Sequence, residues 1–376
     1  MSTPQIEPYL KLMAQKSASD LFFITGAPIC IKVDGRVRPL SQTPLEPGQV
    51  EKIAREIMTT TQQERLDSQH SSNFGVSRAG LGRYRINVYR QRGEVAMVIR
   101  FIRLAIPTMQ DLGLPDVLKT FAMHRNGLVL IVGATGTGKS TTLATMIDHR
   151  AREETGHILT VEDPIEFLFS HRRALVGQRE VGIDTPSYEL ALQDGMREAP
   201  DVIMVGEVRS RETMRAALTY ADTGHLVLTT LHATSANQAM DRLINMFPED
   251  FRGQILADLS LNLRAIVAQR LLQTPQGGRV AALEILVNTP YVSELIREDK
   301  IGEIKEAMTK GAKDGMRTFD QALFQLYKEG KVELEEALSK ADSRADLEWR
   351  LNFGGGVGSL EGEADEEFRL PEDTQR

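Results

Sequence analysis

The chain has 376 residues, of which 26% are charged and 41% are hydrophobic, and its formal net charge is −7. These values are typical of a globular protein and exclude wholesale disorder, and the length predicts two or three domains of about 150 residues each. The acidic balance also argues against a protein that wraps nucleic acid, because such proteins more often present a basic face.

The single cysteine, Cys30, excludes a disulfide framework and any zinc site built from Cys-x-x-Cys pairs. We expect it to be a small, buried, apolar side chain in a reducing compartment such as the cytosol. The chain has no uninterrupted apolar run of about 18 residues, and its first residues lack the basic-then-apolar order of a signal peptide. Any membrane association is therefore expected to be peripheral.

Residues 1–103 are predicted to form a small α+β domain. A helix is expected through Tyr9 and Met13, and the turn Asp34-Gly35 indicates a hairpin. Apolar runs and alternation predict strands at 21–24, 29–33, 83–89 and 95–102. Residues 104–120 carry turn residues without clear periodicity in their first part, so we expect an interdomain linker there.

From residue 121 to about 285, strands and helices alternate as in an α/β domain with a parallel sheet. The expected strands are 128–132, 158–161, 202–205 and 226–229. Residues 286–350 are predicted to be helical, and Thr318 with Gln321 fits a capping box before an apolar helix face. Residues 351–376 form a tail with seven acidic residues against two arginines after residue 360, and we expect it to be disordered.

The segment after the apolar strand 128–132 fits the phosphate-binding pattern G-x-x-x-x-G-K-[ST] at every required position. Its residues are Gly133, Ala134, Thr135, Gly136, Thr137, Gly138, Lys139, Ser140 and Thr141. The glycines let successive backbone N–H groups face a phosphate, and the N-terminus of the following helix adds positive potential. Lys139 can then reach the β- and γ-oxygens, and the Ser140 hydroxyl can ligate Mg²⁺. The pattern therefore predicts nucleotide binding.

Acidic or histidine side chains end three of the predicted strands. Glu162 and Glu166 follow 158–161, Glu207 follows 202–205, and His232 follows the strand that starts at residue 226. Ligands of open α/β sheets bind outside the carboxyl ends of the strands, so these groups can hold Mg²⁺, orient the attacking water or contact the γ-phosphate. The alternative for each carboxylate is a solvated or helix-capping role.

His225 and His232 are expected to have different roles. Seven extended residues place them about 23 Å apart at about 3.3 Å per residue, so they cannot share one ligand. We expect His225 to be a structural or interface residue, and His232, at the carboxyl end, to contact phosphate.

Four motifs in this order resemble the secretion and pilus motor ATPases, and within them the type IV pilus retraction ATPase family (PilT and PilU). They are the P-loop (Walker A), the aspartate box at 158–167, the Walker B segment at 200–207 and the histidine box at 223–232. The resemblance runs from about residue 5 to 350. It implies a PAS-like N-terminal domain, a RecA-like α/β motor domain, a short helical subdomain, ATP with Mg²⁺ as ligands, and a hexameric ring.

The resemblance also implies roles for individual residues. Glu166 is the implied catalytic glutamate, and Glu207 is the implied Walker B acid, which together with Ser140 holds Mg²⁺. In the N-terminal domain, Arg85 and Arg100 are implied to reach the nucleotide of a neighbouring subunit. The implied catalytic residues are Lys139, Glu166, Glu207, His232, Arg85 and Arg100.

One motif of the C-terminal subdomain departs from the pattern of PilT. PilT typically carries Ala-Ile-Arg-x-Leu-Ile-Arg-Glu, whereas residues 291–298 here read Tyr-Val-Ser-Glu-Leu-Ile-Arg-Glu. Together with the acidic tail, this departure is more similar to PilU, the accessory member of the family. The resemblance thus implies a cytoplasmic ATPase at the inner-membrane base of the pilus machine, which assists retraction and twitching motility.

The implied partners are further copies of the chain, the main retraction ATPase PilT and the inner-membrane platform protein, without nucleic acid. Three alternatives remain. The chain could be a pilus assembly or type II secretion ATPase of the same superfamily, a RecA-like nucleic-acid motor, or a ring member that binds ATP but barely hydrolyses it. The absence of a four-cysteine zinc insertion disfavours the first, and the complete set of catalytic side chains disfavours the last.

Overall fold

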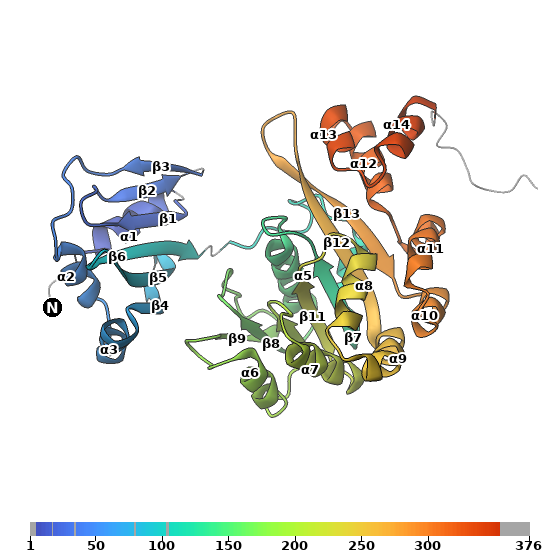
Figure 1. Cartoon of the computed structure of the whole chain (residues 1–376), viewed down its shortest axis with the longest axis horizontal. Helices are drawn as coiled ribbons and strands as arrows, with labels where there is room; N and C mark the ends of the chain where they lie inside the picture. Colours follow the sequence, from blue (N-terminus) through green and yellow to red (C-terminus); the bar gives the residue numbers. More distant parts are fainter. Residues whose placement is uncertain (1–4, 17, 34, 79, 103–104, 354–376) are drawn as a thin grey trace, which may run out of the picture.

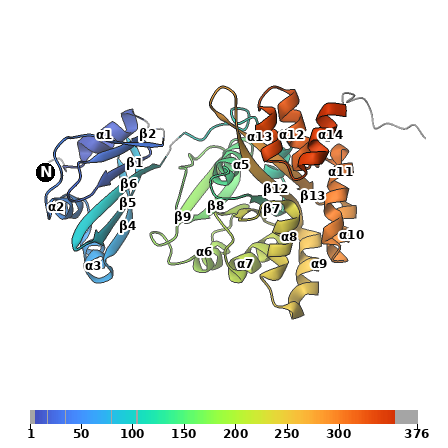
Figure 2. The same cartoon turned by 45° about the horizontal axis from the view of Figure 1, so that its top comes forward.

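A computed structural model describes residues 5–16, 18–33, 35–78, 80–102 and 105–353 of the chain. Most of the predicted acidic tail lies outside these ranges. The described residues form a small N-terminal domain and a larger body, and in both views the small domain lies nearest to strand β9 of the larger one (Figures 1 and 2). No helix within these ranges is long and apolar enough to cross a membrane.

The N-terminal domain is a six-stranded antiparallel sheet with three helices. Its strands have the order β3-β2-β1-β6-β5-β4. They are β1 (Asp20–Phe23), β2 (Cys30–Val33), β3 (Arg36–Pro39), β4 (Ser71–Arg78), β5 (Gly82–Gln91) and β6 (Glu94–Ile102), and the helices are α1 (Glu7–Gln15), α2 (Gln49–Arg55) and α3 (Thr60–Gln69). The predicted helix and strands are present, and β2 and β3 pair as the predicted hairpin, although Asp34 of its turn lies outside the described residues.

Alternation along β5 and β6 places apolar side chains in the core of this domain and leaves arginines on the other face. Tyr84 is fully buried and its hydroxyl donates to the Leu10 carbonyl at 2.9 Å. Arg85 and Arg100 are direct partners in the β5–β6 pair, so they share one face. Cys30 is only partly buried, so the expectation of a buried cysteine was wrong; the strand places it opposite Pro39 near the sheet edge.

The larger body is built on a seven-stranded sheet with the order β13-β12-β7-β11-β10-β8-β9. Its strands are β7 (Gly127–Val132), β8 (Gly156–Glu162), β9 (Ala174–Glu180), β10 (Val202–Val205), β11 (Leu226–Leu231), β12 (Leu263–Gln273) and β13 (Arg279–Val287). All neighbours are parallel except β12 and β13, which form an antiparallel pair. Every residue of β7, β10 and β11 is buried, as expected for parallel strands covered on both faces.

Helices cover both faces of this sheet (Figure 1). Helices α4 (Val117–Ala122) and α5 (Lys139–Glu153) pack on one face, with Phe121 and Met146 in their common core. The other face is covered by α6 (Tyr188–Gly195), α7 (Arg211–Asp222), α8 (Ala236–Asn245), the 3₁₀ turn η1 (Glu249–Phe251) and α9 (Arg252–Asn262). Helix α4 begins inside the segment expected to be a linker, and β13 runs past residue 285.

The C-terminal part packs beside the β12–β13 pair and consists of helices. They are α10 (Pro290–Arg297), η2 (Ile301–Glu303), α11 (Ile304–Lys310), η3 (Ala312–Asp314), α12 (Phe319–Lys328), α13 (Leu334–Ser339) and α14 (Arg344–Phe353). The capping box predicted for α12 is present: Gln321 N–H donates to the Thr318 hydroxyl, and Thr318 N–H donates to the Gln321 side chain.

Candidate nucleotide site

The P-loop turns between β7 and α5 at positions where only glycine fits. A Cβ atom on Gly133 would lie 2.5 Å from the Thr137 hydroxyl oxygen and 2.7 Å from the Gln269 carbonyl oxygen. Gly138 has φ +90°, and a Cβ there would lie 2.9 Å from the Gln269 amide nitrogen. A side chain at either position would collide with these atoms and displace the loop, so the two glycines are required for the loop to adopt this conformation.

Lys139 lies against the loop that precedes it. Its ammonium donates to the carbonyl oxygens of Gly133 at 2.8 Å and Ala134 at 3.0 Å, and the residue is 9% exposed. Burial lowers the pKa of Lys139, while the charges of Glu207 and Glu166 oppose this decrease. The ammonium is thus held at the mouth of the loop, within the electrostatic field of two carboxylates.

Glu207, at the end of β10, is held by two partners. One carboxylate oxygen lies 2.9 Å from Nε2 of His232, and the other accepts a hydrogen bond from Nε of Arg209 at 2.7 Å. The guanidinium of Arg209 also reaches a carboxylate oxygen of Asp163 at 3.4 Å. The histidine and aspartate boxes are therefore joined through the Walker B carboxylate.

The two glutamates of the aspartate box have different environments. Glu162 is buried, and one of its carboxylate oxygens accepts hydrogen bonds from the Thr160 hydroxyl at 2.7 Å and the Gln178 amide at 3.1 Å. Burial raises the pKa of Glu162 to about 7, although these hydrogen bonds and the Glu166 N–H oppose the increase. Glu166 is exposed at the edge of the site. Glu162 is thus buried and hydrogen-bonded to its neighbours, whereas the side chain of Glu166 is exposed.

The raised pKa of Glu162 makes the free energy of unfolding depend on pH. The folded protein binds more protons than the unfolded chain between the unfolded value of 4.5 and about 7, so folding loses stability as pH rises through this window and no further above it. The largest possible loss is on the order of 3 kcal/mol. Thermal unfolding of Glu162→Gln and of the wild type from pH 5 to 8 should therefore show Tm values that diverge in favour of the variant. Parallel curves would contradict the buried, titrating carboxyl.

A cavity of about 340 Å³ collects most of the predicted site residues. It is bounded by the P-loop, by the aspartate box and by the carboxyl ends of β10 and β11. Its lining includes Thr135, Gly136, Lys139, Ser140, Glu162, Glu166, Glu207 and His232. The P-loop and the three polar strand ends are therefore assembled around one space, as expected from the ends of parallel strands.

Arg85 and Arg100 do not line this cavity. They lie at a neighbouring cavity of about 750 Å³ between the two domains, which Thr141 and Glu166 of the same chain also line. Nε of Arg100 donates to the Asp20 carboxylate at 2.9 Å, but its side chain is 65% exposed. Next along β5, Arg83 reaches Glu180 of β9 at 3.4 Å and so connects the two domains.

A third cavity, of about 730 Å³, also borders the P-loop and shares Lys139 and Ser140 with the first. It lies between the segment 105–114, the start of α5 and the β12–β13 pair. Leu112, Leu114 and Leu271 give it apolar walls, and Arg279 adds a charge. Its position beside the P-loop and its mixed lining suit a base and a ribose.

Several residues at the site were not predicted from the sequence. Gln269 of β12 accepts a buried hydrogen bond from the Thr142 hydroxyl of α5 at 2.8 Å and packs against Gly133 and Gly138 of the P-loop. Its only sequence signal is that it interrupts the apolar run 265–272. Arg209 could have been suggested by its place two residues after Glu207. Nothing in the sequence pointed to Tyr188, which lines the cavity.

Comparisons with known proteins agree with this arrangement. Residues 2–339 match the family described as "Type II/IV secretion system protein". The type IV pilus ATPase PilU of Pseudomonas aeruginosa is 50% identical over 351 residues, which is 93% of this chain and 92% of that protein. PilT of the same organism is 41% identical over 336 residues, covering 89% and 98%. The crystal structure of the pilus retraction motor PilT with bound ADP has a TM-score of 0.86 at 39% identity and covers 92% of this chain and 99% of that chain. The resemblance and fold class predicted from the motifs are confirmed.

Proposed function

Because the chain belongs to the Type II/IV secretion system protein family, we propose that it is a Mg²⁺-dependent ATPase that assists type IV pilus retraction. The observation that carries this proposal is the convergence of Lys139, Glu207 and His232 on one cavity, in a chain that matches PilU and PilT over nearly their whole lengths. Deleting only this gene should reduce twitching and pilus retraction. Unchanged retraction force and twitching in the deletion strain would reject the cellular role.

ATP fits the space around the P-loop. Its phosphates would lie on the loop N–H groups and on Lys139, and its base and ribose in the apolar cavity beside segment 105–114. Ser140 and Glu207 line the phosphate cavity and are the groups that would hold Mg²⁺, which prefers one or two protein ligands together with phosphate oxygens. When bound, Mg²⁺ would neutralise charge on the phosphates.

Hydrolysis requires a group that orients the attacking water, and the proposal assigns this role to Glu166. Its side chain is exposed to the cavity, whereas Glu162 is buried and accepts hydrogen bonds from neighbouring side chains. Lys139 would stabilise charge on the β- and γ-phosphates, and His232, held by Glu207, would contact the γ-phosphate.

Glu166→Gln is therefore expected to slow hydrolysis by about 100-fold with nucleotide affinity largely intact, because the amide keeps the size but loses the basicity. Glu162→Gln is the matched control and should leave kcat within a few-fold of the wild type. Steady-state ATPase assays and titration with a fluorescent ADP analogue measure the two quantities. A greater loss of kcat in the control would reverse the assignment within the aspartate box.

We further propose a hexameric ring in which Arg85 and Arg100 contact the nucleotide of a neighbouring subunit. Their place on the exposed face of β5 and β6 supports this, because the face borders the interdomain cavity rather than the core. The proposed partners are PilT and the inner-membrane platform protein, with the ring on the cytoplasmic side. This part rests on the family resemblance and is tested by the mixing experiment described in the Discussion.

A pilus assembly or type II secretion ATPase is the second candidate, and the comparisons disfavour it. Type II secretion proteins E of several bacteria match only 39–40% of this chain and 24–29% of their own length. The matches to PilU and PilT cover both chains almost completely. The chain therefore shares its whole described architecture with the retraction branch.

A further inference from the structure

Arg270 of β12 is fixed by four contacts that join different parts of the chain. Its guanidinium forms an ion pair with Asp342 at 2.7 Å, donates to the Lys340 carbonyl at 2.6 Å and reaches the Thr234 carbonyl at 3.4 Å. It also lies over the ring of Phe319, with 3.7 Å between Cζ and the ring centroid. Lys340 and Asp342 belong to the connection between α13 and α14, whereas Thr234 belongs to the loop that follows His232.

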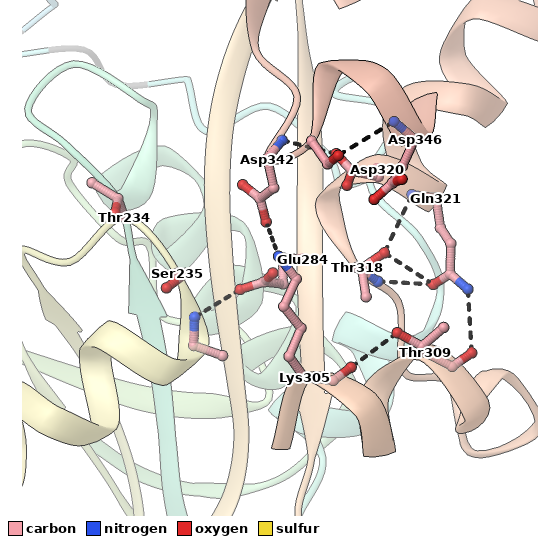
Figure 3. Close-up of polar contacts among 12 residues, drawn as sticks. Thr234, Ser235, Glu284, Lys305, Thr309, Thr318, Asp320, Gln321, Asp342 and Asp346 are labelled. Carbon is pink, nitrogen blue, oxygen red and sulfur yellow. Dashed lines mark hydrogen bonds and ion pairs between the residues drawn. The ribbon is translucent and has the colours of Figure 1, made fainter. Parts of the chain in front are cut away.

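Glu284 of β13 holds the far end of the same loop. It is 2% exposed, and its carboxylate accepts a hydrogen bond at 2.7 Å from the N–H of Ala236, the first residue of α8 (Figure 3). A carboxylate at a helix N-terminus interacts favourably with the unpaired N–H groups of the first turn. This hydrogen bond compensates for the burial of the Glu284 carboxylate, and it fixes the residue at which α8 begins.

Asp342 connects this arrangement to the C-terminal helices. Besides Arg270, it binds the ammonium of Lys305 on α11 at 2.9 Å, and its N–H donates to the Asp320 carboxylate of α12 at 2.8 Å. Figure 3 shows Asp342 next to Lys305, with Glu284 beside them and its carboxylate directed toward the start of α8. One aspartate therefore links α11, α12 and β12.

The loop held in this way is short and carries His232. Only residues 232–235 separate the end of β11 from the start of α8. The His232 carbonyl accepts a hydrogen bond from Arg242 at 2.6 Å, and its Nε2 lies 2.9 Å from Glu207. Moving Thr234 or Ala236 therefore moves the imidazole relative to the Walker B carboxylate.

We propose that Arg270, Glu284 and Asp342 are positioning residues that make the catalytic geometry of His232 depend on the placement of the C-terminal helices. Separation of α11–α14 from β12 would leave the half-buried guanidinium of Arg270 without its carboxylate and release the Thr234 carbonyl. Breaking a partly buried ion pair is costly. The C-terminal helices should therefore be either in contact with β12 or separated from it, without stable intermediate positions. The inference rests on the proposed ATPase function and adds that hydrolysis, but not nucleotide binding, responds to these helices.

Asp342→Asn tests the proposal because asparagine keeps the size of the side chain but loses its charge. We expect kcat to fall by about tenfold, within the range of coupling between linked sites, with the ADP dissociation constant changed by less than about twofold. Asp299→Asn is the matched control, since it breaks another Arg–carboxylate pair, with Arg252 at 2.7 and 2.8 Å, which does not contact the His232 loop. The control pair is more exposed, so Asp299→Asn should lower Tm by no more than Asp342→Asn does, and it should leave kcat unchanged.

A double-mutant cycle identifies the route of the effect. If Asp342 acts through His232, Asp342→Asn should have no further effect on the residual kcat of His232→Gln. Equal kcat in Asp342→Asn and the control, or independent effects in the cycle, would overturn the proposal. If Asp342→Asn does not fold, Arg270→Lys replaces it, because lysine keeps the charge but cannot reach Asp342, Lys340 and Thr234 together. A wild-type protein without ATPase activity would instead reject the proposed function.

Discussion

Lys139→Ala is expected to abolish ATP hydrolysis while the protein stays folded. The ammonium is held at the mouth of the P-loop by two backbone carbonyl groups, where it can meet the β- and γ-phosphates. Loss of this charge removes stabilisation that exists where the transferring phosphoryl group gains charge, and a fall in kcat of at least about 10³-fold is expected. ADP binding should also weaken, because the same ammonium would contact the β-phosphate.

Stability should change little in this variant. Burial lowers the pKa of Lys139, which means that the folded protein bears a cost for the buried charge, and alanine removes that cost. Lys119→Ala on α4 is the control, because this lysine is 46% exposed and, among the described residues, forms an ion pair with Asp116 alone, which directly precedes α4. Thermal unfolding and ATPase assays on both variants measure the result. An undiminished kcat for ATP hydrolysis in Lys139→Ala would contradict the interpretation of the chain as a P-loop ATPase.

Arg85→Ala with Arg100→Ala is the second change for which we expect a large effect. An arginine that contacts the γ-phosphate stabilises the transferring group and contributes on the order of 10³-fold in rate. If it acts on a neighbouring subunit, ATPase activity per subunit should rise with protein concentration as rings assemble. The double variant should be nearly inactive at every concentration.

Mixing experiments distinguish action between subunits from action within one. The arginine double variant, mixed with Lys139→Ala, should recover part of the activity, because some interfaces then pair an intact P-loop with intact arginines. Arg36→Ala with Arg38→Ala is the matched control, since both arginines are exposed on the edge strand β3 of the same domain. No recovery in co-assembled rings of verified size would mean that the arginines act beside their own Glu166, whose cavity they share.

The local features of the site could be predicted because they depend on a few neighbouring residues. The P-loop combines a required residue pattern with a strand before it and a helix after it, and the strand ends carry Glu207 and His232 at the same edge of the sheet. Parallel strands bring their carboxyl ends together regardless of the intervening sequence. That regularity is why four distant segments could be assigned to one site.

The parts that were missed depend on contacts between distant residues. The pattern of β12 mixes apolar residues with Gln269 and Arg270, and no turn residues separated it clearly from α9, so neither β12 nor β13 was predicted. The sequence alone also left Glu162 and Glu166 undistinguished, because the burial of Glu162 and its hydrogen bond from Gln178 of β9 arise from residues distant in the chain. Strand alternation indicates which side chains share a face, but it does not identify their partners across the sheet.

The alternation of β12 has a consequence for how this sequence can change. Gln269 binds α5 on one face of the sheet, and Arg270 binds the His232 loop and the C-terminal helices on the other. Beyond the register shift against β7 at residues 263–265, strand side chains alternate with a period of two, so inserting or deleting one residue between 265 and 268 would exchange these two faces and lose both sets of contacts at once. The turn at 274–278 lies beyond both residues and can change length without that exchange. Natural variation in length should therefore accumulate at the hairpin turn and be excluded from residues 265–268.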